Sequence, residues 1–168
     1  MTEIPSTPAD GNILVLVVPT IANPDAPTLL ELTAASVEDI SCFLTGDGLT
    51  TGLEEATIAD NRLCSTQNRE KPGKSTNTLS LTYIDNTNAT DVAALNTAKE
   101  VLVPGTAQYV VIRRGLPYET AIAAGQTIKL YPIQSGKYNE LPPEENSVLR
   151  ISQKQFVTGD VKEIEIAA

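Results

Sequence analysis

The chain has 168 residues, of which 41% are apolar and 4% aromatic, and its formal net charge is −9. That length suits one domain, residues 1–168, with a core large enough to need neither disulfides nor a metal. The absence of histidine excludes Ser-His-Asp and Cys-His catalysis and imidazole zinc sites. The longest apolar run, Ile13–Val18, is too short for a membrane-spanning helix, which needs about 20 residues.

The charged residues are unevenly distributed along the chain. Residues 1–61 contain ten acids and no base, residues 62–75 have a net charge of +3, and residues 76–168 have a net charge of −2. An acidic body without a basic stripe disfavours specific binding of nucleic acid. The basic segment is either a solvated turn or an arm that complements an acidic surface on another copy.

The N-terminal residues lack the basic region of a signal peptide, so we expect the protein to stay in the cytoplasm. That compartment favours reduced thiols over disulfides. We therefore expect Cys42 and Cys64 to be small residues of the core.

The first part of the chain predicts one buried strand between two irregular segments. Residues 1–11 are rich in proline, threonine and small residues, which is typical of a flexible tail. The run Ile13–Val18 is continuously apolar, as in a strand that is buried on both faces. Residues 19–39 contain three prolines and predict a long connecting arm.

From residue 40 onward most of the sequence predicts β-structure, in segments bounded by Gly, Pro, Asn and Asp. The expected strands cover residues 40–45, 57–65, 76–84, 107–114, 126–134, 147–157 and 161–166. Apolar and polar residues alternate in two of them, so one face of each is expected to contact water. The polar positions are Thr78, Ser80 and Thr82 in one strand and Glu163 and Glu165 in the other.

One helix is predicted at about residues 90–102, between the N-cap residue Thr90 and the breakers Pro104 and Gly105. Its apolar residues recur every three or four positions, so it can cover a sheet with one stripe. The expected fold class is mainly β: an antiparallel β-sandwich or partly closed barrel with one flanking α-helix.

The sequence predicts no catalytic residues, no cofactor and no metal. Glu54-Glu55 and Glu144-Glu145 are the obvious carboxylate pairs, but neighbours in a strand point to opposite faces, whereas a glycosidase needs carboxyl groups about 5 to 9.5 Å apart. Gly46-Asp47-Gly48 lacks the spacing of a calcium loop, and the chain has no glycine-rich phosphate loop. An enzyme would therefore require a carboxylate pair that the fold itself brings together.

Six motifs carry a resemblance to a known family. In chain order they are Asp39–Thr45, then Arg62–Gln67 with Lys71–Gly73, Leu79–Tyr83, Tyr109–Gly115, Ala124–Pro132, and Pro143–Lys154 with Phe156–Gly159. From Asp39 to the C-terminus the sequence resembles the major tail tube proteins of long-tailed phages that infect actinobacteria. No single motif is diagnostic, so the resemblance rests on their order, and residues 1–38 match less specifically.

The resemblance implies a structural virion protein rather than an enzyme. Rings of six copies would stack into the hollow tube of a siphovirus-type, non-contractile tail, assembled in the host cytoplasm. The implied partners are further copies of the chain and the tape measure, tail tip and tail terminator proteins of the same phage. DNA would pass through the lumen without specific binding. A capsid decoration protein or another β-sandwich binding module remains the alternative.

The resemblance also suggests two functional surfaces. It places a ring-stacking loop at the basic residues 66–76, where it would meet acids from the N-terminal block of an adjacent subunit. The candidate residues of this loop are Arg69, Glu70, Lys71 and Lys74. A lumen lined with bases would hold DNA, whereas a neutral or acidic wall would let it slide. The side chains expected to face the lumen are Thr78, Ser80, Thr82, Glu163 and Glu165.

Overall fold

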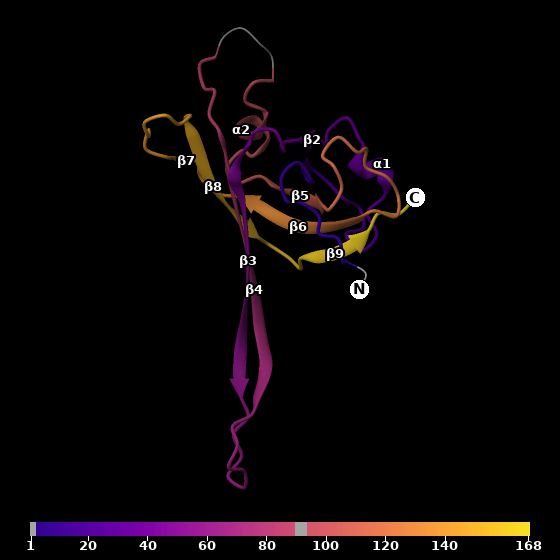
Figure 1. Cartoon of the computed structure of the whole chain (residues 1–168), viewed down its shortest axis with the longest axis vertical. Helices are drawn as coiled ribbons and strands as arrows, with labels where there is room; N and C mark the ends of the chain where they lie inside the picture. Colours follow the sequence, from indigo (N-terminus) through magenta and orange to yellow (C-terminus); the bar gives the residue numbers. More distant parts are fainter. Residues whose placement is uncertain (1–2, 90–93) are drawn as a thin grey trace.

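A computed structural model describes residues 3–89 and 94–168. These residues form nine strands in one antiparallel sheet and two short helices, which confirms the mainly β fold class (Figure 1). Neither helix has the length and apolar character of a membrane span. The strands are β1 (Ile13–Val18), β2 (Glu38–Asp39), β3 (Leu44–Ala59), β4 (Glu70–Ile84), β5 (Ala107–Arg114), β6 (Thr127–Ser135), β7 (Asn139–Glu140), β8 (Arg150–Val157) and β9 (Lys162–Glu165); the helices are α1 (Leu29–Leu32) and α2 (Thr97–Val101).

The sheet runs in the order β2-β1-β5-β6-β8-β4-β3 and is not closed into a barrel. Its shape depends on β6, which pairs with β5 along one edge and divides its other edge between two strands. Residues 127–130 pair with β9, and residues 133–135 pair with β8. The layer β8-β4-β3 therefore leaves the plane of β1-β5-β6 and folds over it, and in Figure 1 β3 and β4 run along the long axis while β5 and β6 run across it.

The folded sheet encloses the larger of two hydrophobic cores. This core joins apolar side chains of both layers with two from the α2 region, and burial of each large one contributes about 1.5 to 3 kcal/mol. Its buried members are Val15, Val17, Ile40, Leu79, Leu81, Tyr83, Ala98, Leu102, Val110, Ile112, Tyr131, Ile133 and Ile151. The alternation predicted for residues 78–83 is thus confirmed, because the odd-numbered residues lie inside.

The second core lies against the reverse face of β1. Leu14, Leu16 and Val18 point into it, together with Leu32 of α1 and Ile166 near the C-terminus. β1 is therefore buried on both faces, as its uninterrupted apolar sequence predicted.

The expected connecting arm, residues 19–39, contains ordered structure that covers this second core. Thr28 caps α1, and the Glu31 carboxylate accepts hydrogen bonds from the backbone N–H groups of Thr28 at 2.9 Å and Ala22 at 2.7 Å. These bonds lower the pKa of Glu31. Backbone hydrogen bonds join residues 27–29 to Ala167, so the arm lies against the C-terminal segment.

The interior also contains a polar network centred on Gln153 of β8. Its Nε2 donates to the carbonyl oxygens of Leu102 at 2.8 Å and Gly136 at 2.7 Å, and its Oε1 accepts from the Tyr83 hydroxyl at 2.9 Å. Gln153 is fully buried. One amide thus satisfies polar groups from three separate segments, which joins the α2 region to both layers of the sheet.

The predicted helix at residues 90–102 is shorter than expected. Residues 90–93, including the expected cap Thr90, lie outside the described part of the chain, and α2 begins after Asn96. Asn86 holds the residues that directly precede α2. Its side-chain amide donates to the Leu95 carbonyl, and its backbone N–H donates to the Asn96 side chain. These tertiary bonds hold Leu95 and Asn96 outside the helix that local capping signals predicted there.

The strands expected at residues 40–45 and 57–65 were wrong in their bounds, because a single long strand, β3, covers residues 44–59. The expected loop at residues 66–76 is also wrong for residues 70–76, which belong to β4. Leu49 still packs against the larger core, but residues 50–59 of β3 are all exposed, so this part of the threonine- and glycine-rich sequence carries no apolar alternation.

The cysteines are not core residues. Both Cys42 and Cys64 are exposed free thiols, Cys42 between β2 and β3 and Cys64 between β3 and β4. The segments that contain them are fixed by backbone pairing rather than by burial of the thiol.

Replacing Gln153 with alanine should lower the free energy of unfolding by about 3 kcal/mol, since each buried polar group left unpaired costs about 1 to 3 kcal/mol. Chemical denaturation followed by circular dichroism measures the change. Gln67→Ala, at an exposed position between β3 and β4, is the matched control. Equal stability of the two variants would contradict a structural role for the network.

Candidate assembly surfaces

The most prominent feature is a long β-hairpin formed by β3 and β4. Its pairing extends from Leu44 opposite Tyr83 to Ala59 opposite Glu70, and Figure 1 shows the far half projecting from the body. Leu53 and Ile58 in this far half are 58% and 55% exposed, and Leu63 at the tip is fully exposed. An isolated two-stranded ribbon is at best marginally stable in water, and the far half of this hairpin has little packing from its own chain to support it.

β3 is also an edge strand. It pairs with β4 on one side and ends the strand order on the other, so its 16 residues present a row of free backbone groups. On the opposite side of the same layer, β8 pairs with the two-residue strand β7. Long unpaired edges are templates for strand addition from a second chain.

The four candidate stacking residues lie in the far half of this hairpin. Glu70, Lys71 and Lys74 are exposed residues of β4, and Arg69 is exposed just before it. The Lys71 ammonium lies 2.9 Å from the Asp60 carboxylate across the ribbon.

Asp60 also pairs with Arg62 at 2.9 Å. Hydrogen bonds from Arg62 and Lys71 lower the pKa of Asp60. Part of the basic charge of the hairpin is therefore already paired within the chain.

Three of the residues expected in the lumen lie together on one polar surface. Thr78 is exposed and Ser80 and Thr82 are half-buried on the face of β4 that points away from the core. The adjoining strands continue this surface with Thr50 of β3 and with Ser152, Lys154 and Phe156 of β8. Among these side chains only Lys154 is charged. The same face also carries Arg150 of β8, which is paired with Glu144, and Glu54 of β3, so the surface has little net charge.

Glu163 and Glu165 are exposed on β9, as the alternation there predicted. They pair with Lys129 and Thr127 of β6, on the surface of the sheet that also carries Tyr131. The polar surface of β4 is on the reverse side of the sheet, so the two sets of expected lumen residues do not form one continuous surface.

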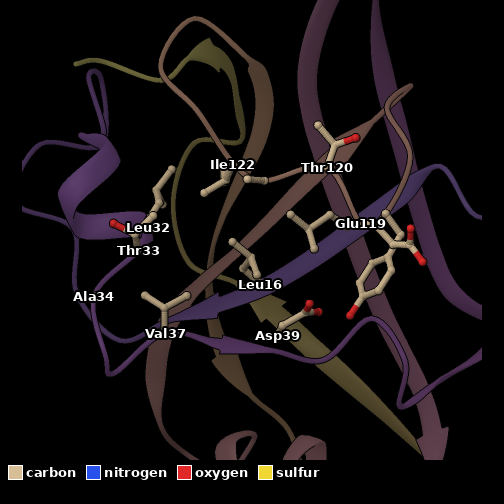
Figure 2. A pocket seen from close by; sticks show the side chains of 12 residues that line it. Leu16, Leu32, Thr33, Ala34, Val37, Asp39, Glu119, Thr120 and Ile122 are labelled. Carbon is tan, nitrogen blue, oxygen red and sulfur yellow. The ribbon is translucent and has the colours of Figure 1, made fainter.

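A groove of about 350 Å³ lies between α1 and the loop that joins β5 to β6 (Figure 2). Leu16, Leu32, Val37 and Ile122 form much of its floor, and acidic side chains lie at its rim. Its loop wall is held by the buried Arg113, whose guanidinium donates to backbone oxygens of residues 117, 118 and 120. Desolvation lowers the pKa of Arg113.

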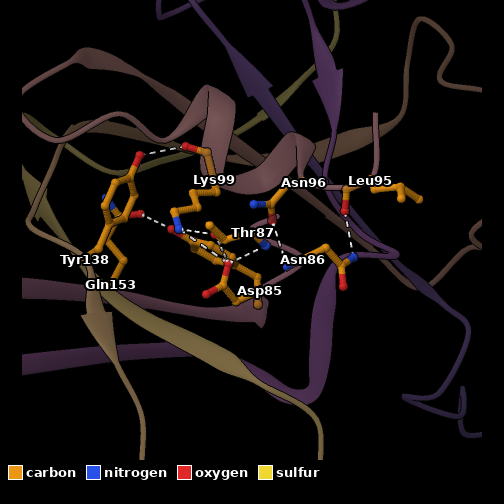
Figure 3. Close-up of polar contacts among 9 residues, drawn as sticks. Asp85, Asn86, Thr87, Leu95, Asn96, Lys99, Tyr138 and Gln153 are labelled. Carbon is orange, nitrogen blue, oxygen red and sulfur yellow. Dashed lines mark hydrogen bonds and ion pairs between the residues drawn. The ribbon is translucent and has the colours of Figure 1, made fainter. Parts of the chain in front are cut away.

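A second groove, of about 500 Å³, lies beside α2, where the chain leaves β4. Figure 3 shows the polar cluster formed by its lining residues Thr87, Lys99 and Tyr138 with Asp85. Lys99 lies 3.4 Å from the Asp85 carboxylate and donates to the Thr87 hydroxyl, which in turn donates to Asp85. The Tyr138 hydroxyl donates to the Lys99 carbonyl at 2.7 Å.

Burial opposes ionisation of Asp85, but hydrogen bonds from Thr87 and the charge of Lys99 outweigh it, and the pKa of Asp85 is lowered. The ionised carboxylate is thus part of the fold. Tyr83 is affected in the opposite direction, since desolvation raises its pKa.

Sequence reasoning missed the hairpin edge and both grooves. The long strand β3 carries no periodic apolar signal, and the groove residues come from segments far apart in the chain. Within residues 3–89 and 94–168, no three His, Cys, Asp or Glu side chains gather as a metal site would require.

Asp85→Asn should lower the free energy of unfolding by about 1 kcal/mol at pH 7, the usual contribution of such charge-assisted bonds. Because the folded-state pKa of Asp85 is depressed, this contribution is present above its ordinary pKa and is lost as the pH falls through the folded value. The difference from the parent chain should therefore shrink below about pH 4. Denaturation at several pH values tests this, with the exposed Asp160→Asn as control; a pH-independent difference would contradict it.

Comparison with known proteins relates this chain to a family and to a solved structure. A model of the phage tail tube protein family matches residues 1–168. No curated protein sequence is significantly similar. Among solved structures, the chain is similar to one in the cryo-EM structure of the anti-feeding prophage (AFP) baseplate, 6-fold symmetrised, with a TM-score of 0.52 and 17% identity over 97% of this chain and 99% of that chain. At so low an identity, this structural similarity shows a shared fold and nothing more. The family match over the full length shows that this chain belongs to the phage tail tube proteins.

Proposed function

We propose that this virion protein assembles into six-membered rings that stack into the hollow tube through which the phage genome is ejected. The observation that carries the proposal is the long unpaired edge of β3 and its projecting, unpacked hairpin. In a monomer the edge leaves backbone groups without a strand partner and the hairpin lacks packing. In a polymer of identical chains, neighbouring copies would supply both contacts.

Ring closure would join the two ends of one layer. The free edge of β3 in one copy would pair with the β7 edge of the next copy, so that the layer β3-β4-β8-β7 continues around the ring. Such a heterologous contact closes when its rotation divides a full turn evenly. The six-fold symmetry named for the similar baseplate structure supports six copies.

The lumen wall would be the polar surface of this layer, with Thr78, Ser80 and Thr82 at its centre. A duplex that carries one negative charge per about 1.7 Å would find almost no cations to hold it there. Electrostatic effects reach only about 8 Å at physiological salt, which suffices across a narrow gap between wall and duplex. Glu163 and Glu165, on the other surface of the sheet, would contribute at most a more distant negative charge.

The remaining roles follow from this assembly. The tube would contact the tape measure protein inside and the tail tip and terminator proteins at its ends. It would assemble in the host cytoplasm, take part in no reaction and bind DNA without specificity. The neutral wall and the absence of histidine agree with a conduit rather than an enzyme.

Stacking of the rings would use the hairpin. Arg69, Lys71 and Lys74 would meet acids of an adjacent subunit, with Glu70 among them on the same strand. Each exposed ion pair contributes only about 0.2 to 1 kcal/mol, so these charges would set orientation and register more than affinity.

The proposal predicts that the purified chain, when concentrated, forms rings or hollow tubes of constant diameter. Negative-stain electron microscopy of a concentration series measures this. A decoration protein or other binding module would remain a compact monomer or small oligomer. If the chain stays monomeric even when expressed with its tail tip proteins, the tube proposal is wrong.

Thiol labelling of assembled tubes tests the lumen wall. In a background with Cys42 and Cys64 replaced by serine, Thr78→Cys should react with a small maleimide but not with one coupled to a polymer too large for the bore. Ser36→Cys, exposed between α1 and β2, should react with both reagents. Rapid labelling of position 78 by the bulky reagent would contradict the assignment.

A further inference from the structure

We infer that the groove beside α2 is the receptor for the hairpin tip of a second copy, an inference that rests on the proposed stacking. The hairpin tip is defined here as residues 57–74.

The hairpin tip and the α2 groove lie at opposite ends of the same strand. β4 begins in the hairpin tip at Glu70 and ends at Ile84, and the chain enters the groove with Asn86. In Figure 1 the tip is at one end of the long axis, and α2 is toward the other. Copies that stack along the direction of β4 therefore bring the tip of one copy to the α2 groove of the next.

The surface chemistry of the two sites is complementary. The hairpin tip has four bases and two acids, a net charge of +2, and it presents the fully exposed Leu63. Among the described residues that line the groove, Lys99 and Glu100 are the charged ones. Because Lys99 is paired with Asp85, the exposed Glu100 leaves the groove with an uncompensated negative charge.

The α2 groove also offers apolar surface of the right size. Val103 is 48% exposed at its wall, and the ring of Tyr138 and the side chain of Leu95 line it further. Its volume of about 500 Å³ exceeds that of one leucine side chain and leaves room for the flanking backbone of a turn. Leu63 is the most exposed large apolar side chain of the hairpin tip.

The side of the groove formed by α2 is held by polar contacts within the chain. The Lys99–Asp85–Thr87 cluster fixes α2 to the end of β4, and Tyr138 holds the Lys99 carbonyl. A preformed receptor lowers the entropy lost on association, which matters for a contact made by a single loop.

The groove beneath α1 fits this role less well. It lies on the far side of β1-β5-β6, under the second core, and not along the line of β3 and β4. Its own acids could attract the hairpin tip, so it serves as the alternative site in the test.

A projecting knob that fits a pocket elsewhere on the same molecule makes a contact that does not close on itself, and such contacts propagate into stacks. The acid that receives the basic hairpin would then be Glu100 of the α2 region rather than one from residues 1–61. This differs from the pairing expected from the charge distribution along the sequence.

Cross-linking between two kinds of chain tests the inference. One chain carries Cys42→Ser and keeps the native thiol Cys64 in the hairpin tip. The other carries Cys42→Ser, Cys64→Ser and Val103→Cys in the α2 groove. After the two are mixed and assembled, a short bis-maleimide should join them, and mass spectrometry should identify the peptide pair that contains positions 64 and 103.

In the matched control, Ser36→Cys replaces Val103→Cys and places the second thiol beside the α1 groove. No cross-link to position 64 is expected there. Tubes that yield the control cross-link, or neither cross-link, would overturn the docking inference and leave the tube proposal intact. Failure of the parent chain to assemble would instead count against the proposed function, and with it the stacking on which the inference depends.

A second variant checks the apolar contact without added thiols. Leu63→Ser should reduce the length of tubes while leaving single rings, because the hairpin tip joins rings and not neighbours within one ring. Circular dichroism should show an unchanged fold, since Leu63 has no packing within its own chain. Tubes of parental length would contradict the role of Leu63.

Discussion

The division of one edge of β6 between β9 and β8 is the constraint on which the rest of the molecule depends. Only residues 133–135 of β6 pair with β8, and this short junction lets the layer β8-β4-β3 take its own direction. Because the sheet folds at that point, its two layers can enclose a core without closing into a barrel. The same change of direction carries β3 and β4 out of the body as a projecting hairpin (Figure 1).

β8 shows how strongly this arrangement overrides local sequence. Gln153 and Gln155 point into the interior, while Phe156 is 51% exposed on the polar surface. The amide of Gln153 is compensated by three hydrogen bonds, whereas neither polar atom of the Gln155 side chain has a partner among the described residues. Strand alternation, once fixed by pairing with β4, determines which side chains are buried, whatever their polarity.

The molecule combines a well-packed body with a surface that is incomplete by itself. The two cores and the polar clusters around Gln153 and Lys99 fix the layers and α2 in place. The far half of the hairpin has pairing but no packing, and the edge of β3 has unsatisfied backbone groups. In a tube both would be completed by identical neighbours, so the stability of the hairpin would depend on assembly rather than on the chain alone.

Local sequence was sufficient where a segment's own pattern matched its burial. The continuous apolar run of β1 gave the correct strand bounds and its burial on both faces, and the alternation in β4 and β9 correctly separated inner from outer side chains. The six motifs, which occur in order across most of the domain, indicated the tail tube family. The candidate basic residues lie in a strand and a hairpin tip rather than in a loop, and their role in stacking stays a prediction.

Tertiary structure alone decided the features that depend on partners distant in the sequence. The threonine- and glycine-rich part of β3 became a strand through pairing with β4, and α2 was shortened because Asn86 binds the residues before it. The exposure of both cysteines, the inward amide of Gln153 and the two grooves likewise arise where separate segments meet. Sequence by itself determined the faces of the strands, since side-chain alternation is a local property. The fold-over at β6 and the projecting hairpin required the whole chain, because strand pairing links residues that local pattern cannot relate.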